Sequence, residues 1–243
     1  MNEQSNMPVM SAAPEPFYQI WIRALTKPGE RTYAEFAASP NAKATTAYLW
    51  YFGAALVQVF FASLVQNAAM RQMMQQFGDG QYGQYFSNSG GIATRLITAV
   101  CGAPIAAGIS VLIFALSVAL VQWIAKMFGG RGTYDQMAYA ISAIASPFLL
   151  VSSILTLLSA IPVPFVGLCF SLLGILAGLY VLVLQVMAVK GVNQFGWGQA
   201  IGSFLIPILG IACLCACVVG GLFALLGPVI RNTFEQIQQG LGQ

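Results

Sequence analysis

Three cysteines spaced two residues apart, Cys213, Cys215 and Cys217, are the residues with the clearest potential for metal chemistry. A structural zinc site needs four Cys, His, Asp or Glu ligands. On a helix Cys213 and Cys217 share a face while Cys215 points away, and no Asp or Glu stands near them. The chain contains no histidine, the commonest transition-metal ligand and general base. We therefore expect small apolar packing residues here, and we predict no metal, no cofactor and no catalytic residue.

A second candidate for chemistry is the glycine-rich stretch GGRG at residues 129–132. Its backbone N–H groups and Arg131 could bind a phosphate at the start of a helix. However, Asp135 would repel a phosphate, and its charge suits the positive end of the helix dipole. Thr133 and Gln136 form a capping-box pattern. We interpret the stretch as a helix-breaking turn followed by a cap, and the chain has no nucleotide-binding motif.

Polar side chains also occur inside the apolar runs, among them Gln58, Gln66, Gln122 and Gln185. They could line a cavity, or they could form hydrogen bonds between helices. No Asp, Glu, Lys or Arg lies well inside an apolar run, although ion-coupled carriers usually need such a residue at depth. This pattern argues against an ion-coupled carrier and leaves a path for lipids or apolar substrates open.

The elements that hold these residues are membrane helices. Apolar residues make up 58% of the chain and charged residues only 7%, against about a quarter in a soluble domain. We predict an all-α polytopic integral membrane protein with five transmembrane helices in the lipid bilayer. The expected spans are about 46–69, 103–125, 136–160, 165–189 and 199–227. The second apolar run, residues 93–127, exceeds the length needed to cross, so it is either strongly tilted or bent near Gly102 and Pro104.

The chain divides into three expected parts. Residues 1–39 form a polar N-terminal segment without a cleavable signal peptide, residues 40–228 form the membrane domain, and residues 229–243 form an external amphipathic tail. Ser39 and Pro40 look like an N-cap and first helical residue for the first span.

Amphipathic stretches flank the spans at both ends. Residues 17–27 place Phe17 and Trp21 on one helical face, which suits an interfacial helix. The alternative is a helix packed on the polar end of the bundle. In the tail, Ile230 and Phe234 share a face of a second expected interfacial helix. In the fourth span, Gly174 and Gly178 allow close helix packing, either within the monomer or between two copies.

The basic residues give the orientation. With the N-terminus inside, seven Lys and Arg residues lie on the inner side and three on the outer side. The positive-inside rule then predicts a cytoplasmic N-terminus and an external C-terminus. Residues 17–35, 126–135 and 190–198 would form the inner face. Its candidate partner-facing residues are Arg23, Lys27, Lys126, Arg131 and Asp135.

Several short motifs resemble the prokaryotic branch of the Yip (Ypt/Rab-interacting protein) membrane family. They are PFYQIWIRALTKPGE before the first span, Lys126-Met-Phe-Gly129-Gly130, Gly132-Thr133-Tyr134, Tyr139 and Ala145-Ser146-Pro147. The resemblance covers about residues 17–228. It implies five spans, a cytoplasmic N-terminus and, for the prokaryotic branch, a plasma-membrane location. Eukaryotic members are Golgi and ER proteins linked to Rab GTPases, but their Asp-Leu-Tyr-Gly-Pro and Tyr-Gly-Tyr motifs are absent here. No functional residue is therefore transferred.

Together these features predict a non-enzymatic membrane-organising or adaptor protein. Its expected partners are the lipid bilayer and another membrane protein or a second copy of itself, with no nucleic acid. The alternative is a small-molecule or lipid transporter or scramblase that uses a polar seam between spans three and five.

Overall fold

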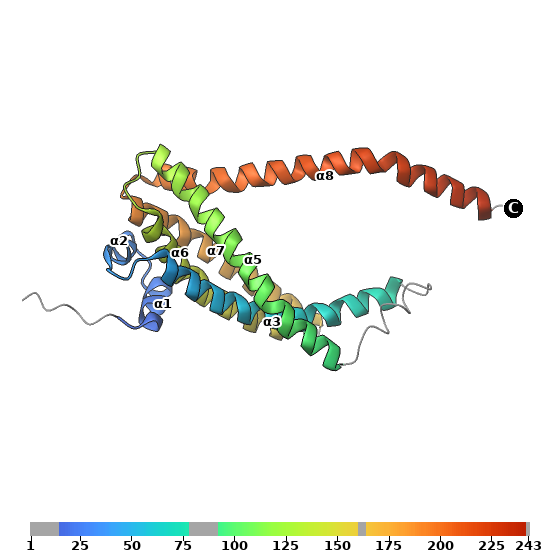
Figure 1. The fold of residues 1–243 in the computed structure, drawn as a ribbon, viewed down its shortest axis with the longest axis horizontal. Coiled ribbons are helices and arrows are strands. Elements are labelled where there is room, and N and C mark those ends of the chain that lie inside the picture. Colours follow the sequence, from blue (N-terminus) through green and yellow to red (C-terminus); the bar gives the residue numbers. More distant parts are fainter. Residues whose placement is uncertain (1–14, 78–91, 160–163, 242–243) are drawn as a thin grey trace, which may run out of the picture.

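The computed structural model describes residues 15–77, 92–159 and 164–241, and within these ranges the chain forms helices and no strand. Two short helices come first, and five long helices follow (Figure 1). Their bounds are α1 Phe17–Thr26, α2 Glu30–Ala38, α3 Ala44–Phe77, α5 Ile92–Met127, α6 Tyr134–Ser159, α7 Pro164–Asn193 and α8 Trp197–Leu241.

The five long helices each contain a stretch that is long and apolar enough to cross a bilayer. These stretches run for 20 to 29 residues, and about 20 residues suffice to cross the hydrocarbon core. The all-α fold with five spans is therefore confirmed. The stretches are Ala44–Ser63, Ala99–Met127, Tyr134–Leu158, Cys169–Asn193 and Trp197–Gly221.

Helix α6 is the centre of the bundle. Of the residues in its most apolar stretch, 44% are buried, against 11% in α8. Every residue from Met137 to Pro147 is buried, and most of them are Ala, Ser or other small residues. Small side chains let neighbouring backbones approach closely, which explains how α6 packs against α1, α2, α3, α5 and α7 at once.

Helix α5 is one continuous helix that includes Pro104. Its 36 residues correspond to about 54 Å at 1.5 Å per residue. It crosses the bundle obliquely in Figure 1. The helix is not divided at Gly102 or Pro104, and its tilt or bend in a bilayer stays a prediction.

Helix α8 is longer than the sequence suggested. We expected a span ending near residue 227 and a separate helix in the tail, but α8 continues without interruption from Trp197 to Leu241. The tail is therefore an extension of the fifth span, and its end projects far from the rest of the bundle (Figure 1). The side chains of Ile230 and Phe234 lie outside the described residues, so their interfacial role stays a prediction.

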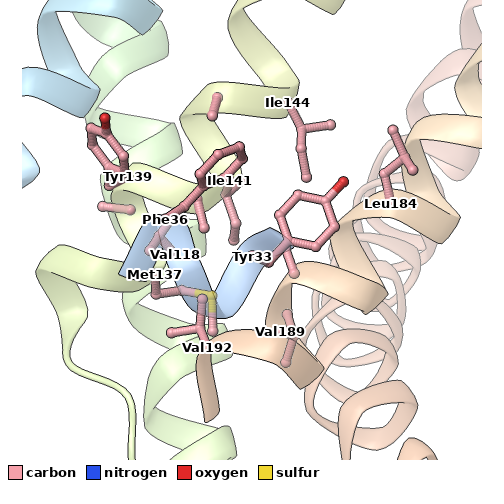
Figure 2. Close-up of a cluster of buried hydrophobic side chains, with 14 of the residues drawn as sticks. Tyr33, Phe36, Val118, Met137, Tyr139, Ile141, Ile144, Leu184, Val189 and Val192 are labelled. Atoms are coloured by element: carbon pink, nitrogen blue, oxygen red, sulfur yellow. The ribbon is translucent and has the colours of Figure 1, made fainter. Parts of the chain in front are cut away.

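Helix α2 was not expected from the sequence. Tyr33, Phe36 and Ala37 occupy positions i, i+3 and i+4, and all three are buried, as for the inner face of an amphipathic helix. Figure 2 shows Tyr33 and Phe36 among buried side chains of α6 and α7, including Ile144 and Leu184. The short helix α2 therefore belongs to the core of the bundle.

The predicted N-cap at Ser39 is wrong. Ser39 is the C-cap of α2, and α3 begins only at Ala44. The Ser39 hydroxyl accepts a hydrogen bond from the backbone N–H of Asn41 at 3.3 Å, so it stabilises the turn between α2 and α3. The misassignment arose because a Ser-Pro pair suits the end of one helix as well as the start of another.

The loop between the fourth and fifth spans is shorter than expected. The expected spans 165–189 and 199–227 leave residues 190–198 between them, but α7 continues to Asn193 and α8 begins at Trp197. Helix α7 ends because Gln194 adopts the left-handed conformation, with φ of 55°, as is common just after a helix C-terminus. The polar residues Lys190 and Asn193 are therefore helical and have fixed positions.

Candidate partner-docking platform

Helices α1 and α2 and the two short connections α5–α6 and α7–α8 lie together at one end of the bundle (Figure 1). We call residues 17–35, 126–135 and 190–198 the polar platform. These are the three segments that the sequence predicted to share one face of the membrane. The structure brings them together, and it also shows which contacts connect them.

Two tyrosines hold α1 against the bundle. Tyr33 of α2 donates a hydrogen bond to the carbonyl oxygen of Ala24 at 2.8 Å. Tyr180 of α7 donates to the carbonyl oxygen of Leu25 at 2.6 Å. Both acceptors lie in the last turn of α1, where carbonyl groups have no partner within the helix. Burial, and then the nearby Tyr180, raise the pKa of the Tyr33 hydroxyl, which keeps it a protonated donor.

Helix α2 is attached to α7 through a close contact and an ion pair. Gly191 lies so near α2 that an added Cβ would stand 2.6 Å from the carbonyl oxygen of Glu30. Beside it, Lys190 Nζ pairs with Glu30 Oε2 at 2.6 Å and lies 4.4 Å from the ring centre of Trp197. The Lys190 side chain is only 12% exposed, so its ammonium group pairs with Glu30 inside the platform and is not presented on the surface.

A buried amide pair joins α5, α7 and the α5–α6 connection. Asn193 and Gln122 exchange hydrogen bonds, with Gln122 Nε2 donating to Asn193 Oδ1 at 3.1 Å and Asn193 Nδ2 donating to Gln122 Oε1 at 3.3 Å. Asn193 Oδ1 also accepts from the N–H of Gly132 at 3.2 Å, and Gln122 Nε2 donates to the Gly132 carbonyl at 2.6 Å. Both side chains are almost fully buried. Of the two roles considered for Gln122, hydrogen bonding between elements is the one observed.

The glycines of residues 129–132 are required by backbone conformation at Gly129 and by packing at Gly130 and Gly132. Gly129 has φ of +87°, a conformation that favours glycine. A Cβ at Gly130 would stand 2.5 Å from Asn193 Oδ1, and one at Gly132 would stand 2.6 Å from Val192 Cγ1. Because the Gly132 N–H already donates to Asn193, it does not point to a free anion. The structural interpretation of this stretch therefore fits better than a phosphate loop.

The capping box that the sequence predicted at the start of α6 is confirmed. The N–H of Thr133 donates to Gln136 Oε1 at 2.9 Å, and the N–H of Gln136 donates to Thr133 Oγ1 at 3.3 Å. A related arrangement starts α8, where Gln199 Oε1 accepts from the Gly196 N–H at 2.9 Å and Gln199 Nε2 donates to the Phe128 carbonyl at 3.1 Å. Gln199 thus connects α8 to the end of α5.

Asp135 has a role that the sequence did not suggest. Its Oδ1 accepts a hydrogen bond from the backbone N–H of Ala44 at 3.2 Å. Ala44 is the first residue of α3, so Asp135 of α6 supplies the cap that Ser39 was expected to give. Nearby, the hydroxyls of Tyr48 and Tyr134 lie 2.6 Å apart. Helices α3 and α6 are therefore joined at their first turns.

The predicted partner-facing residues lie on the outer surface of the platform, with one exception. Lys27, Lys126, Arg131 and Asp135 are exposed. Arg23 is half-buried, because its guanidinium lies 4.8 Å from the ring centre of Phe36 and pairs with Glu15 at 3.3 Å. All charged side chains that the structure describes lie at this end of the bundle. The exposed charges therefore form a rim at the platform end of the bundle, around a scaffold held by buried hydrogen bonds.

The two predicted anchors of α1 behave differently. Phe17 is 52% exposed and lies next to the exposed Tyr18 and Ile22, as an interfacial contact requires. Trp21 packs edge-on against Trp50 of α3, with ring centres 5.9 Å apart. The alternative of packing on the polar end of the bundle therefore applies to Trp21, and the interfacial role of the exposed Phe17 stays a prediction.

Two packing expectations do not hold among the described residues. An added Cβ at Gly174 or Gly178 would meet nothing within 4 Å, so these glycines do not serve close packing within the monomer, and packing between two copies stays a prediction. Cys213, Cys215 and Cys217 are all exposed on α8, which contradicts a packing role inside the bundle. In the described part of the chain no three Cys, Asp or Glu side chains stand close enough to hold a metal ion.

The sequence reasoning missed Gly191, Asn193 and Tyr33. A usable signal was present in each case. Gly191 and Asn193 follow a long apolar run and precede a short turn, and Tyr33 belongs to the i, i+3, i+4 pattern of α2. What the sequence alone could not indicate is which distant backbone groups these residues contact.

A family model described as Yip1 domain matches residues 22–220. No curated protein and no solved structure matches the chain. The matched range begins inside α1 and extends to the end of the fifth apolar stretch. It contains nearly the whole polar platform.

Proposed function

This chain belongs to the Yip1 domain family, and from that premise we propose that it is a membrane-organising or adaptor protein. It acts without catalysis, by presenting the polar platform to a partner. The partner is another membrane protein or a second copy of this chain. The observation that carries the proposal is the construction of the platform, in which three segments far apart in sequence are connected by buried hydrogen bonds and close backbone contacts.

A rigid platform supports docking because little conformational freedom is lost when a partner binds. Buried polar groups of the platform, such as Asn193 and the Tyr33 hydroxyl, are paired within it. The rim, in contrast, holds exposed charges of both signs, including Lys27, Arg31 and Asp135. Arg31 has 95% of its side chain exposed. Charges of this kind favour specificity and rate of encounter with a charged partner.

The proposed orientation places the platform in the cytoplasm at a plasma membrane. Seven of the ten Lys and Arg residues lie at this end of the bundle, as the positive-inside rule expects for the cytoplasmic side. The C-terminal end of α8 would then be external. The basic excess also suits the anionic lipids of the cytoplasmic leaflet, so the same rim would contact lipid headgroups.

The alternative of a transporter has weaker support. It requires a polar path between the third and fifth spans, α6 and α8. The cavity that borders these helices has three polar side chains among fourteen lining residues. A chain without histidine also lacks the commonest proton-transfer group. For these reasons we favour the adaptor over a carrier or an enzyme.

Amine-reactive cross-linking of native membranes tests the proposal. All four lysines of the chain lie at the platform end, namely Lys27, Lys43, Lys126 and Lys190. A membrane-permeant cross-linker therefore samples this end and no other surface except the N-terminal amine. The proposal expects cross-links from Lys27 or Lys126 to one recurrent protein or to a second copy of this chain. Cross-links scattered over many abundant proteins, with none enriched, would contradict it.

A further inference from the structure

A cavity of about 300 Å³ opens between α3, α5, α6, α7 and α8. Its floor consists of buried apolar side chains, such as Val118, Ile141 and Phe204, and its rim includes the exposed Ile113 and Ile211. Helices α5 and α8 lie close together near the platform and diverge away from it (Figure 1). The cavity therefore faces the lipid that surrounds the bundle.

Three polar side chains line this otherwise apolar space: Tyr51, Ser117 and Gln185. Ser117 bonds to the carbonyl of Ile113 in its own helix. Within the described part of the chain, neither the Gln185 amide nor the Tyr51 hydroxyl has a hydrogen-bond partner. The Tyr51 ring is held in place by stacking on Phe114, with ring centres 4.2 Å apart.

The depth of these groups makes their lack of partners significant. Gln185 lies eight residues before Asn193, the end of α7, which is about 12 Å along the helix. Tyr51 lies seven residues after the start of α3, about 10 Å along its helix. Both are therefore inside the region where lipid tails begin, and an unpaired amide or hydroxyl there costs free energy. A ligand that accepts hydrogen bonds would remove that cost.

We propose that this cavity binds one acyl chain of a bilayer lipid, with Gln185 and Tyr51 donating hydrogen bonds to its carbonyl oxygen. The apolar floor matches a hydrocarbon tail. A lipid carbonyl is an acceptor at the upper end of that tail, at the depth of the two donors. The volume lies at the lower end of the range of about 300–1,000 Å³ for small-molecule sites, which suits one chain and excludes a whole two-chain lipid. The mainly apolar lining also disfavours filling by water.

Photolabelling of the full-length protein in liposomes tests this site. The probe is a phosphatidylcholine with a diazirine on one acyl chain, and a free fatty acid with the same group forms a second arm. Labelled peptides are identified by mass spectrometry. We expect enrichment at cavity residues 113–121 and 204–211 over the lipid-exposed residues 172–176 of α7. The more strongly enriched arm identifies whether a phospholipid or a free fatty acid supplies the chain.

Paired variants separate the cavity from the general lipid surface. Ser117→Phe places a ring at the cavity rim, whereas Ala119→Phe places the same ring on an exposed position of α5 outside the lining. Gln185→Leu removes a donor in the cavity, and Gln58→Leu makes the same change in α3 outside it. Ser117→Phe should abolish the enrichment. Gln185→Leu should lower it about two- to tenfold, the effect of one lost hydrogen bond.

The proposal would be overturned if cavity residues were labelled no more than residues 172–176, or if Ser117→Phe and Ala119→Phe gave the same labelling. Enrichment that survives Gln185→Leu unchanged would also contradict the hydrogen-bonding part of the proposal. Because Ser117 is exposed, its variant is expected to fold and keeps the test decisive even if Gln185→Leu is unstable.

Discussion

The side chain of Asn193, at the end of α7, accepts a hydrogen bond from the backbone N–H of Gly132, in the connection between α5 and α6, across 3.2 Å. This hydrogen bond links the α5–α6 connection to the end of α7, where the α7–α8 connection begins. The backbone adds a second connection, since the N–H of Arg131 donates to the carbonyl oxygen of Asn193 at 3.3 Å. Asn193 is fully buried, so its partners have no water as a substitute.

Replacing Asn193 with Leu should therefore destabilise the protein. The change leaves the Gly132 N–H and Gln122 Oε1 buried without their partner, at a cost of about 1–3 kcal/mol for each orphaned group. Thermal unfolding of the purified protein in detergent, followed by size-exclusion chromatography, measures the loss. Asn41→Leu, at an exposed turn, is the matched control and should melt close to wild type. Equal melting temperatures for the two variants would refute the role of Asn193.

The close contact of Gly191 predicts how a larger residue there would affect the packing of α2 against α7. Gly191→Ala would place a Cβ 2.6 Å from the Glu30 carbonyl oxygen, so α2 must shift, at a cost of about 1–3 kcal/mol for overpacking. We expect faster protease cleavage between α1 and α2 and a lower melting temperature. Gly198→Ala, where an added Cβ meets nothing within 4 Å, should change stability by less than about 1 kcal/mol. If Gly191→Ala is as stable as Gly198→Ala, the close contact is not important.

The capping role of Asp135 predicts that two substitutions at this position differ in their effect on stability. Asp135→Ala removes the acceptor for the first N–H of α3 and should cost about 0.5–2 kcal/mol, as for other N-caps. Asp135→Asn keeps a side-chain oxygen and should lose much less. Chemical denaturation or heat in detergent gives the ranking. The two variants would be equally destabilised if charge, and not capping, were the important property of Asp135.

The orientation can be tested with a reporter at the C-terminus. Five spans and a cytoplasmic N-terminus predict that a reporter fused after residue 243 is active only outside the cytoplasm, in the manner of an export-dependent phosphatase. A second reporter inserted after Arg131 should report the cytoplasm. Cytoplasmic activity at the C-terminus would contradict either the orientation or the number of spans that cross the membrane.

The sequence predicted the five long apolar helices well because apolar length is a direct physical requirement of the bilayer. It also predicted the capping box of Thr133 and Gln136, since that pattern is local. It did not predict contacts between elements. Asp135 was assigned to its own helix, although it caps α3, and Ser39 was assigned to α3, although it ends α2. In both cases the sequence pattern assigned the side chain to the helix next to it in the chain, whereas Asp135 caps a helix distant in sequence.

The same limit explains the glycines. Gly174 and Gly178 match a common packing motif, yet in this structure they lie open. The glycines that do permit close approach are Gly130, Gly132 and Gly191, which match no spacing rule. Whether a glycine is needed depends on which backbone passes beside it, and that is decided by tertiary structure. In the candidate site, therefore, the exposed charges were predictable from sequence, but the scaffold that fixes them was not.

The most direct test of the platform as a docking surface is site-specific photo-cross-linking in living cells. A photoreactive amino acid is placed at Arg31, on the exposed rim, or at Leu172, on the lipid-exposed face of α7, and adducts are compared by immunoblot. The account predicts a discrete adduct from position 31 that is lost in the Asn193→Leu background, and none from position 172. Absence of a discrete adduct at position 31, or an adduct equally strong at position 172, would contradict the proposal that this platform binds a partner.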